Sequence, residues 1–482
     1  MRAAGGTCAR ASSRARSAPR PFRRSLRRLA APTGRSRGSR SSPASRSPRR
    51  RAGPPRARPT TRSTSRSRTG TRRPPRKRRT TRRSDRAGRR RGRGGRGVGA
   101  RRALRRTVDR DDRLSALDPP LLRRAFLGAA VRVEGGAIVV RRVLAPGPLR
   151  VGDSLAAIDG APIGSLDVLA EALRRAASRE HVRVGVTRDG ASIELVVPVV
   201  PMPAERVDGA TVRYGQLHWR GHRVRTIEVA PDAAIATVLF LQGIYCQSID
   251  LALSPDAPLA RLVRELAARG VATLRVERPG TGDSEGPPCG ELDLHGEIEL
   301  YAAALDALGA PPILFGHSLG GAIAPMLAHR SLGVVAYGAP GEPWARTMRD
   351  GIERQLRLRG ADEARIAAAL ARFDADPWAE GHGRSPALHR QLDALDFADL
   401  WSRVRVPVLV IVGEHDWVTG ERAQLAIAEH ARNARVLRLS GLDHSFTTHA
   451  SLEASLREHG RGAFDVRVAE ATAAFARAIA GP

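Results

Sequence analysis

One stretch of sequence decides the fold: residues 311–328 read Pro-Pro-Ile-Leu-Phe-Gly-His-Ser-Leu-Gly-Gly-Ala-Ile-Ala-Pro-Met-Leu-Ala. The apolar run at its start predicts a buried strand, and the run from residue 322 predicts a helix. Between them, Ser318 is flanked by Gly316 and Gly320. Because glycine has no Cβ, the backbone can turn sharply there and raise the serine hydroxyl off the sheet. We expect Ser318 to be a nucleophile, with the N-terminal amides of the helix aimed at any anion that forms beside it.

A second serine lies in a similar glycine setting, Gly282-Asp283-Ser284-Glu285-Gly286. Two prolines, Pro287 and Pro288, follow this segment, so no helix begins behind the serine. We therefore expect Ser284 to lie in a loop after a strand, and Ser318 remains the candidate nucleophile.

A serine nucleophile needs a base and a carboxylate that orients the base. Asp416 follows a buried-strand pattern at 406–412, and His444 follows a second strand pattern at 436–439. The C-terminal ends of parallel strands meet at one edge of a sheet, where active sites form. An isolated Asp or His in such a place is usually a turn or surface residue. Together and in this order, they favour a catalytic triad of Ser318, Asp416 and His444.

From about Val212 to the end, these motifs resemble the α/β-hydrolase superfamily, whose nucleophile lies in a Gly-x-Ser-x-Gly elbow and whose triad follows the order Ser, Asp, His. Residues 278–284 are similar to an Arg-Gly-x-Gly-x-Ser loop common in that superfamily. The resemblance implies an α/β fold with a mostly parallel sheet flanked by helices. It also implies that the insertion at 342–400, which has helical periodicity, caps the pocket. Strand and helix patterns agree with this fold at 237–241, 259–269, 271–276 and 334–337.

The resemblance also implies an oxyanion hole built from two backbone N–H groups. One belongs to Leu319, directly after the nucleophile, and the other to Ile244, in the loop 242–246 after the third strand. Family members commonly carry His-Gly where this chain has Gln242-Gly243, although a Gln side chain can still hydrogen-bond the loop. The implied chemistry is acyl transfer to water through an acyl-enzyme, with no metal and no organic cofactor. A serine at the elbow argues against dehalogenase or epoxide-hydrolase chemistry, which uses a carboxylate nucleophile in this fold.

A second, smaller domain is expected at about 121–200, joined by a Pro-rich linker at 198–203 to a hydrolase domain at 205–482. It combines alternating strand patterns with an Asp-Gly turn and one helix pattern. Together these resemble a PDZ domain of the bacterial, protease-associated kind, a small α+β fold. The resemblance implies that the loop Phe126-Leu127-Gly128-Ala129 receives a peptide C-terminus while the peptide adds a strand. The loop departs from the usual Gly-Leu-Gly-Phe, and the alternative is a domain that merely packs against the hydrolase.

The formal net charge of +34 comes from one end of the chain. Residues 1–107 contain 39 of the 82 lysines and arginines and only one of the 48 acidic residues, Asp85, whereas the rest carries a net charge of −4. Few large apolar residues occur in this tail, so it cannot bury enough surface to offset its ordering entropy. We expect residues 1–110 to be a disordered basic tail.

Three interpretations of the tail stay open. The first is binding to nucleic acid or anionic lipid, and the second is a transit peptide. The third is a mis-called N-terminal extension, because Lys77 is the only lysine, as in GC-rich coding, and no Met lies between Met1 and Met202. We favour the third, with translation starting nearer Val108, so that nucleic acid is a partner only if the tail is genuine.

The three cysteines, Cys8, Cys246 and Cys289, form no even disulfide framework. No apolar run reaches membrane-spanning length and no signal-peptide pattern follows Met1, so we expect a cytoplasmic protein with reduced thiols. Cys246 and Cys289 are then small pocket-lining residues. Because both lie in loops at strand C-termini, a link between them is the alternative.

Taken together, the patterns favour a serine hydrolase of esters, thioesters or peptides, including serine aminopeptidase-like enzymes. Its substrate is a small-molecule ester or a peptide, and the PDZ-like domain recruits or regulates by binding a peptide C-terminus. The alternatives are an acyltransferase on the same fold, and a PDZ scaffold protein whose hydrolase domain is not catalytic.

Overall fold

The computed structural model describes residues 120–379 and 383–481. The basic tail lies outside these residues, so its expected disorder stays a prediction. The described residues form two sheets of more than two strands, each with its own hydrophobic core. None of the helices among them combines the length and the apolar character that a membrane span requires.

The first sheet belongs to the smaller domain, and all its strand pairs are antiparallel. Its order is β1-β2-β3-β5-β6, with β4 paired to β3. The alternation of buried Val182, Val184 and Val186 with more exposed neighbours places one face of β5 in the core. Helix α2 is capped by Ser165, whose Oγ accepts from the Val168 N–H at 3.3 Å. The elements are β1 (Ala129–Glu134), β2 (Ala137–Val143), β3 (Ser154–Ile158), β4 (Ala161–Pro162), α2 (Leu166–Arg175), β5 (His181–Arg188) and β6 (Ala191–Pro198).

The predicted linker at 198–203 begins later than expected. Strand β6 ends at Pro198, and the Val200 N–H still donates to the Phe126 carbonyl at 3.0 Å. The first residues of that segment therefore pair with the smaller domain, because a backbone next to a strand finds its hydrogen-bond partners there.

The second sheet has eight strands in the order β14-β13-β12-β11-β9-β10-β8-β7. The six strands from β14 to β10 are parallel, and β8 and β7 are added antiparallel at the other end. The expected mostly parallel sheet is thus confirmed. The strands are β7 (Ala210–Trp219), β8 (His222–Pro231), β9 (Ala236–Leu241), β10 (Val271–Val276), β11 (Ile313–His317), β12 (Gly333–Tyr337), β13 (Val408–Gly413) and β14 (Ala434–Leu439); a separate pair is formed by β15 (Thr447–Thr448) and β16 (Ala463–Phe464).

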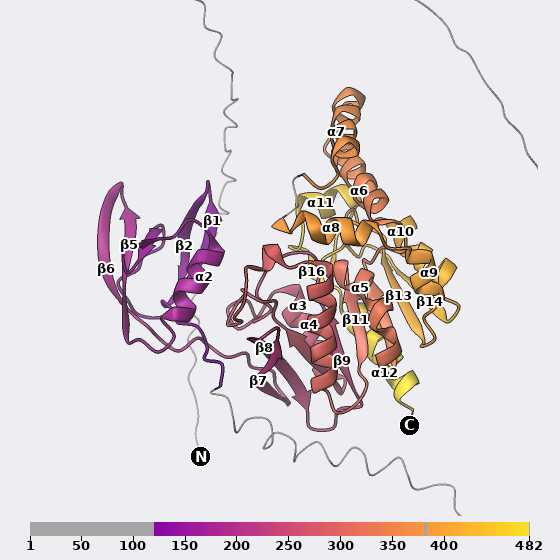
Figure 1. Ribbon diagram of the computed structural model, residues 1–482, viewed down its shortest axis with the longest axis horizontal. Helices are drawn as coiled ribbons and strands as arrows, with labels where there is room; N and C mark the ends of the chain where they lie inside the picture. Colours follow the sequence, from indigo (N-terminus) through magenta and orange to yellow (C-terminus); the bar gives the residue numbers. More distant parts are fainter. Residues whose placement is uncertain (1–119, 380–382, 482) are drawn as a thin grey trace, which may run out of the picture. The chain divides into compact units, whose positions relative to one another are not determined.

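Helices cover both faces of this sheet (Figure 1). Strand side chains alternate between the two faces, so Val238 and Phe240 pack against α3 and α12, while Leu239 and Leu241 pack against the opposite helices. Each such buried side chain stabilises the fold by roughly 1.5–3 kcal/mol. One face carries α3 (Pro258–Ala268) and α12 (Val466–Ala480), and the other carries α4 (Leu294–Ala307), α5 (Leu319–Leu327), α9 (Phe397–Ser402) and α10 (Glu421–His430).

The insertion at 342–400 is helical, as its periodicity predicted. It contains α6 (Trp344–Leu358), α7 (Glu363–Ala375), α8 (Pro386–Asp393) and most of α9. In α7, Ile366, Leu370 and Phe373 form the buried side. Helices α6 and α7 stand out from the sheet in Figure 1. Helix α11 (Leu452–Arg457) and two short 3₁₀ turns, η1 (Cys289–Glu291) and η2 (Ala328–Arg330), complete the described elements.

Candidate active site

The candidate nucleophile lies at a strained turn. Strand β11 ends at His317, helix α5 begins at Leu319, and Ser318 between them has φ +54° and ψ −119°. A positive φ is unfavourable for a residue with a side chain and persists only where its surroundings enforce it. A Cβ added at Gly316 would lie 2.6 Å from the Gly321 Cα, and one at Gly320 would overlap the Leu241 carbonyl oxygen. The glycines are therefore required by close backbone approach, as the sequence predicted.

Asp416 and His444 meet at the same edge of the sheet. They follow β13 and β14 respectively, and the His444 Nδ1 donates to the Asp416 Oδ2 at 2.9 Å. Both side chains are buried, with exposed fractions of 3% for Asp416 and 7% for His444. Because the carboxylate fixes the proton on Nδ1, the His444 Nε2 is left as an acceptor.

Three groups that the sequence did not indicate hold the carboxylate of Asp416. The backbone N–H groups of Val418 and Thr419 donate to its Oδ1 at 2.9 and 3.0 Å. The Gln424 side chain donates to its Oδ2 at 3.1 Å from the first turn of α10. These donors fix the carboxylate in the orientation that His444 needs. The sequence carries no signal for the two backbone donors, because almost any residue can offer a backbone N–H, and none for Gln424, because its side chain reaches Asp416 only in the folded chain.

The pKa values of the pair move in opposite directions. Burial alone lowers the pKa of His444, but the charge and hydrogen bond of Asp416 outweigh burial and raise it above 6.5. Burial raises the pKa of Asp416, and the attraction of His444 with the donated hydrogen bonds brings it below 3.8. The geometry therefore stabilises an imidazolium beside a carboxylate, which is the charge distribution of a general base after it takes a proton.

Close contacts link the nucleophile turn to this pair. The His317 Nε2 donates to the His444 carbonyl at 2.9 Å, and the two rings are 4.9 Å apart. A Cβ added at Gly338, just after β12, would lie 2.8 Å from the His444 Nδ1. Burial first, and then the charge of His444, lower the pKa of His317 to about 3, so that His317 is a neutral packing residue. The structure thus brings the Ser318 turn and the Asp416–His444 pair to one edge of the sheet.

The two residues expected to supply oxyanion donors both lie near Ser318. Leu319 is the first residue of α5, where N–H groups have no partner within the helix. Ile244 follows Gly243, at which an added Cβ would lie 3.5 Å from the Ser318 Cβ. The Gln242 side chain does not bind its own loop as expected; its Nε2 donates to the Val276 carbonyl at the end of β10, at 2.5 Å. Strand β10 pairs with β9, so the carbonyl at its end lies within hydrogen-bond reach of this side chain.

The expectation of reduced thiols at Cys246 and Cys289 is wrong for this structure. The two residues form a disulfide with a Cα–Cα distance of 5.7 Å. Cys246 belongs to the loop after β9, and Cys289 opens the η1 turn after β10. The sequence predicts both loops at one edge of the sheet. It does not give the distance between the two cysteines, which decides whether a disulfide can form.

The second serine is confirmed as a loop residue. Ser284 is completely buried, and its Oγ accepts from the Arg225 N–H at 3.0 Å. No helix follows it directly; the next element is the η1 turn. Its hydroxyl therefore supports the backbone and has no access to a substrate.

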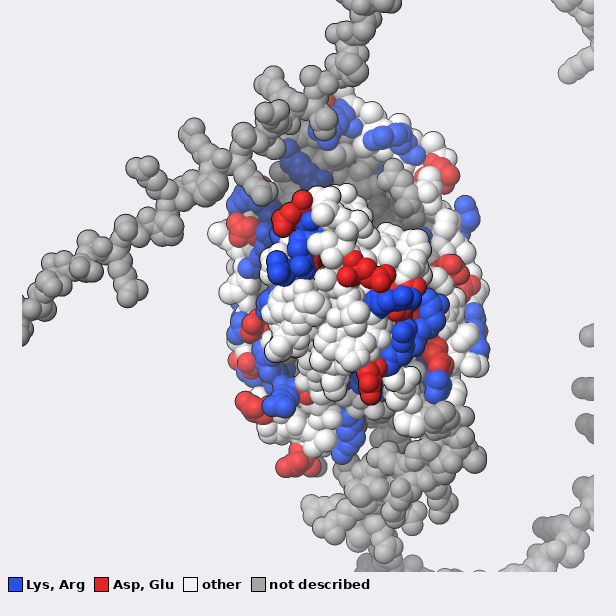
Figure 2. All heavy atoms as spheres, turned by 90° about the vertical axis from the view of Figure 1, so that its left-hand side faces the viewer, with Lys and Arg blue, Asp and Glu red and all other residues white. Residues whose placement is uncertain are grey.

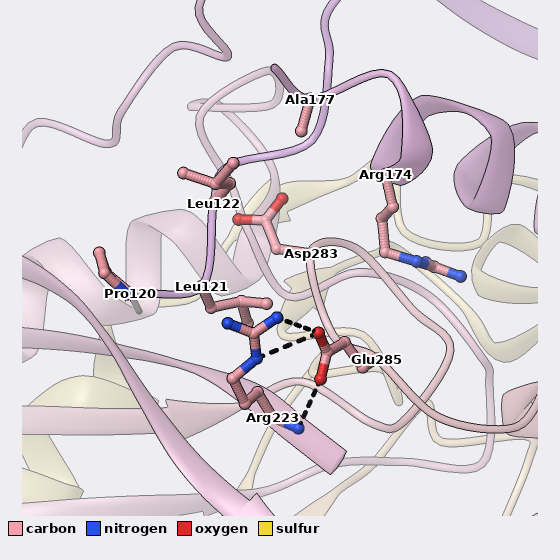
Figure 3. A pocket seen from close by; sticks show the side chains of 8 residues that line it. All are labelled: Pro120, Leu121, Leu122, Arg174, Ala177, Arg223, Asp283 and Glu285. Atoms are coloured by element: carbon pink, nitrogen blue, oxygen red, sulfur yellow. Dashed lines mark hydrogen bonds and ion pairs between the residues drawn. The ribbon is translucent and has the colours of Figure 1, made fainter. Parts of the chain in front are cut away.

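A pocket of about 370 Å³ lies beside this loop and contains neither Ser318 nor His444 (Figure 3). Its charged lining residues are already paired. The Arg223 side chain and N–H both bind the Glu285 carboxylate, while the Asp283 carboxylate accepts from Arg124 and Arg225. Paired charges of this kind stabilise the loop and leave few free hydrogen-bonding groups for a ligand. The lining consists of Pro120, Leu121, Leu122, Arg174, Ala177, Arg223, Asp283 and Glu285.

The PDZ-like loop precedes β1 and lines a small apolar cavity. Gly128 has φ +71°, and its carbonyl accepts from the N–H groups of Leu144 and Ala145 at 2.7 and 3.0 Å. A cavity of about 40 Å³ lies next to the loop, and two leucines of α2 form part of its wall. The cavity is lined by Phe126, Leu127, Ala129, Val131, Leu149, Leu155, Leu169 and Leu173.

Comparison with protein families agrees with both domains. Residues 238–454 match the model of the alpha/beta hydrolase family, and residues 125–199 match that of the PDZ domain. The larger domain belongs to the alpha/beta hydrolase family. The smaller one is a PDZ domain. No curated protein is similar enough to the chain to count as a match.

Solved structures similar to the hydrolase part include several esterases. The esterase domain of a Rhodothermus marinus protein is 21% identical, with 56% of this chain and 100% of that chain covered and a TM-score of 0.37. Est1E from Butyrivibrio proteoclasticus with ferulic acid bound is 18% identical, with 54% and 96% covered and a TM-score of 0.39. A monoacylglycerol lipase of Paleococcus ferrophilus is 18% identical, with 52% and 98% covered and a TM-score of 0.36.

Proposed function

We propose that this alpha/beta hydrolase is a serine hydrolase that cleaves ester, thioester or peptide bonds with Ser318, His444 and Asp416 as its triad. The observation that carries the proposal is the 2.9 Å hydrogen bond between His444 Nδ1 and the buried Asp416 carboxylate. It lies at the sheet edge where β11 ends in the strained Ser318 turn.

The mechanism follows from these positions. The His444 Nε2 takes the proton of the Ser318 hydroxyl while the oxygen attacks the carbonyl carbon of the substrate. The carbonyl oxygen becomes an oxyanion, which accepts hydrogen bonds from the Leu319 and Ile244 N–H groups. The intermediate collapses to an acyl-enzyme as His444 returns its proton to the leaving group. Water then attacks the acyl carbon with His444 again as the base, which releases the acid and restores Ser318.

The PDZ domain is proposed to recruit a peptide C-terminus. Its loop, Phe126 to Ala129, would present backbone amides to the terminal carboxylate, and the peptide would add a strand to the sheet. The adjoining apolar cavity of about 40 Å³ supports a small apolar side chain at the last position. Titration of the chain with peptides that end in Ala or Val, against amidated copies of the same peptides, tests this. Equal affinity for the free and amidated ends would rule it out.

The redox state of Cys246 and Cys289 indicates the compartment of the protein. A cytoplasmic location is the expectation from the sequence, but a persistent disulfide is typical of an oxidising compartment. Peptide mapping of the native protein under non-reducing conditions decides between the two. Free thiols at both positions favour the cytoplasm, and a Cys246–Cys289 cross-linked peptide favours an oxidising compartment.

A substrate series tests the catalytic proposal. Purified protein is assayed with p-nitrophenyl esters of graded chain length, the matching thioesters and peptide p-nitroanilides. We expect turnover of at least one class and a loss on the order of 10³-fold or more in Ser318→Ala, with folding retained. Ser284→Ala is the matched control, because its hydroxyl is buried in a loop; it should keep activity. Unchanged turnover in Ser318→Ala would refute the triad.

A further inference from the structure

Two arginines and one glutamate form a buried cluster under the loop 242–246. The exposed fractions are 1% for Arg278, 0% for Glu297 and 4% for Arg384. The Glu297 Oε1 accepts from the Arg278 Nε at 2.5 Å and from the Arg384 Nη2 at 2.7 Å. Burying three charged groups is costly unless each one is held by partners. The other partners of the two guanidinium groups indicate what the cluster does.

Both guanidinium groups bind carbonyls of the loop. The Arg278 Nη2 donates to the Gly243 carbonyl at 2.7 Å, and its Nη1 donates to the Tyr245 carbonyl at 2.8 Å. The Arg384 Nη1 donates to the Ile244 carbonyl at 3.1 Å. The two guanidinium groups thus bind three consecutive carbonyls of the loop, and two of these bind the same planar guanidinium. This fixes the orientation of the loop backbone.

The bond to Gly243 has a direct consequence for Ile244. The Gly243 C=O and the Ile244 N–H belong to one planar peptide unit, and in a trans peptide they point in opposite directions. With the carbonyl directed at Arg278, the Ile244 N–H points away from the cluster. Charge-assisted hydrogen bonding to the carbonyl also polarises the peptide, which makes its N–H a stronger donor.

We propose that Arg278 is a positioning residue that orients and polarises the Gly243–Ile244 peptide as an oxyanion-hole donor. The inference rests on the proposed function, since it assigns a role within that reaction. Glu297 holds Arg278 in place, and Arg384 brings the cap insertion into the same cluster. With two guanidinium groups and one carboxylate, the cluster has a net positive charge, which favours an anion at the loop.

The test compares Arg278→Lys with Arg275→Lys. Lysine keeps the positive charge but cannot hold two carbonyls in the fixed geometry of a guanidinium. Arg275 is the matched control: it is also fully buried on β10 and binds Glu205 and the Ile249 carbonyl, outside the loop 242–246. Kinetics use the p-nitrophenyl ester that the wild type hydrolyses fastest. Inhibition uses a trifluoromethyl ketone of the same acyl chain, which forms an oxyanion when the serine attacks it.

We expect Arg278→Lys to lower kcat by about 10- to 100-fold and to change KM by less than about 3-fold. Trifluoromethyl ketone affinity should fall by about the same factor as kcat/KM, because both report stabilisation of the oxyanion. Arg275→Lys should keep kcat within about 2-fold of the wild type. If Arg278→Lys does not fold, Glu297→Gln replaces it and should shift kcat and inhibitor affinity in the same direction.

Three outcomes would overturn the assignment: an unchanged kcat in the Arg278 and Glu297 variants, an effect on KM alone, or an equal loss in Arg275→Lys. Failure of the proposed function is distinguishable, because in that case the wild-type protein itself shows no turnover that depends on Ser318.

Discussion

At the scale of single residues, the hydrogen bonds around the Asp416 carboxylate hold it in one orientation toward His444. The Asp416 carboxylate accepts hydrogen bonds from Val418, Thr419 and Gln424, and it also accepts one from the His444 Nδ1. This arrangement fixes both the ring orientation and the tautomer of His444. With the proton held on Nδ1, the His444 Nε2 is the nitrogen left to act as a base, and in the proposed mechanism it serves Ser318.

Asp416→Asn should therefore retain the fold and lose activity. The amide can still accept from the Val418 and Thr419 N–H groups, but its NH₂ favours the wrong tautomer of His444. We expect kcat to fall by about 10⁴-fold, as measured in a serine protease with the same change. Asp443→Asn is the control, because Asp443 is equally buried but its carboxylate contacts Thr447, the Ser445 N–H and His449. Equal losses in the two variants would contradict the assignment.

The pH dependence of kcat/KM gives a second residue-scale prediction. The base must be neutral, and Asp416 raises the pKa of His444 above 6.5 in spite of burial. Activity should then be complete at alkaline pH and fall as the pH drops through that raised pKa. In Asp416→Asn, the residual activity should show a lower apparent pKa, because the carboxylate charge is gone. An acid limb below 6.5 in the wild type would contradict this electrostatic account.

The candidate triad residues could be predicted from the sequence, but the groups that hold them in place could not. Each of the triad residues follows a strand pattern, and the order Ser318, Asp416, His444 along the chain can be read without a structure. Gln424 in α10 and Arg384 in the bend before α8, by contrast, reach their partners only in the folded chain. No spacing in the sequence marks them as partners of a carboxylate or of a loop carbonyl.

At the scale of elements, the loop after β9 is fixed at several points. Arg278 and Arg384 hold its carbonyls, the Tyr301 hydroxyl accepts from the Gln242 N–H at 2.9 Å, and the Cys246–Cys289 disulfide closes its end. Strands β9 and β11 were predictable because their apolar residues are consecutive and buried on both faces. The conformation of the loop after β9 could not be predicted, since it depends on residues more than 30 positions away.

Removing the disulfide should destabilise the hydrolase domain. The bond closes a loop with a sequence separation of 43, for which the chain-entropy model gives about 4 kcal/mol. Cys289→Ser should unfold at a lower urea concentration than the wild type, and dithiothreitol should lower the wild-type midpoint to a similar value. Cys8→Ser is the control and should leave the midpoint unchanged. Identical midpoints for oxidised and reduced wild type would show that the bond does not form in solution.

At the scale of the whole molecule, charge is distributed very unevenly along the chain. Residues 1–107 carry a net charge of +38, and the remainder carries −4. On the face shown in Figure 2, acidic and basic side chains of the described residues are interspersed. We therefore expect any strong attraction to a polyanion to come from the tail.

The full chain should bind duplex DNA through this tail, with an affinity that falls linearly on a logarithmic scale as salt increases. A variant lacking residues 1–107 should lose that binding and keep its hydrolytic activity. Fluorescence anisotropy with a labelled duplex of arbitrary sequence measures the first property, and ester hydrolysis measures the second. Retained DNA binding in the truncated variant would place the polyanion site in the folded domains instead.

The site at which a fluorophosphonate probe attaches shows directly whether Ser318 is the nucleophile. The probe phosphonylates a serine only if a base removes its proton and an oxyanion hole stabilises the product. Wild-type protein is labelled, digested and mapped by mass spectrometry, beside Ser318→Ala and Ser284→Ala. We expect one adduct, on Ser318, that is retained in Ser284→Ala and absent from Ser318→Ala. An adduct on another serine, or no adduct on a folded protein that hydrolyses esters, would contradict it.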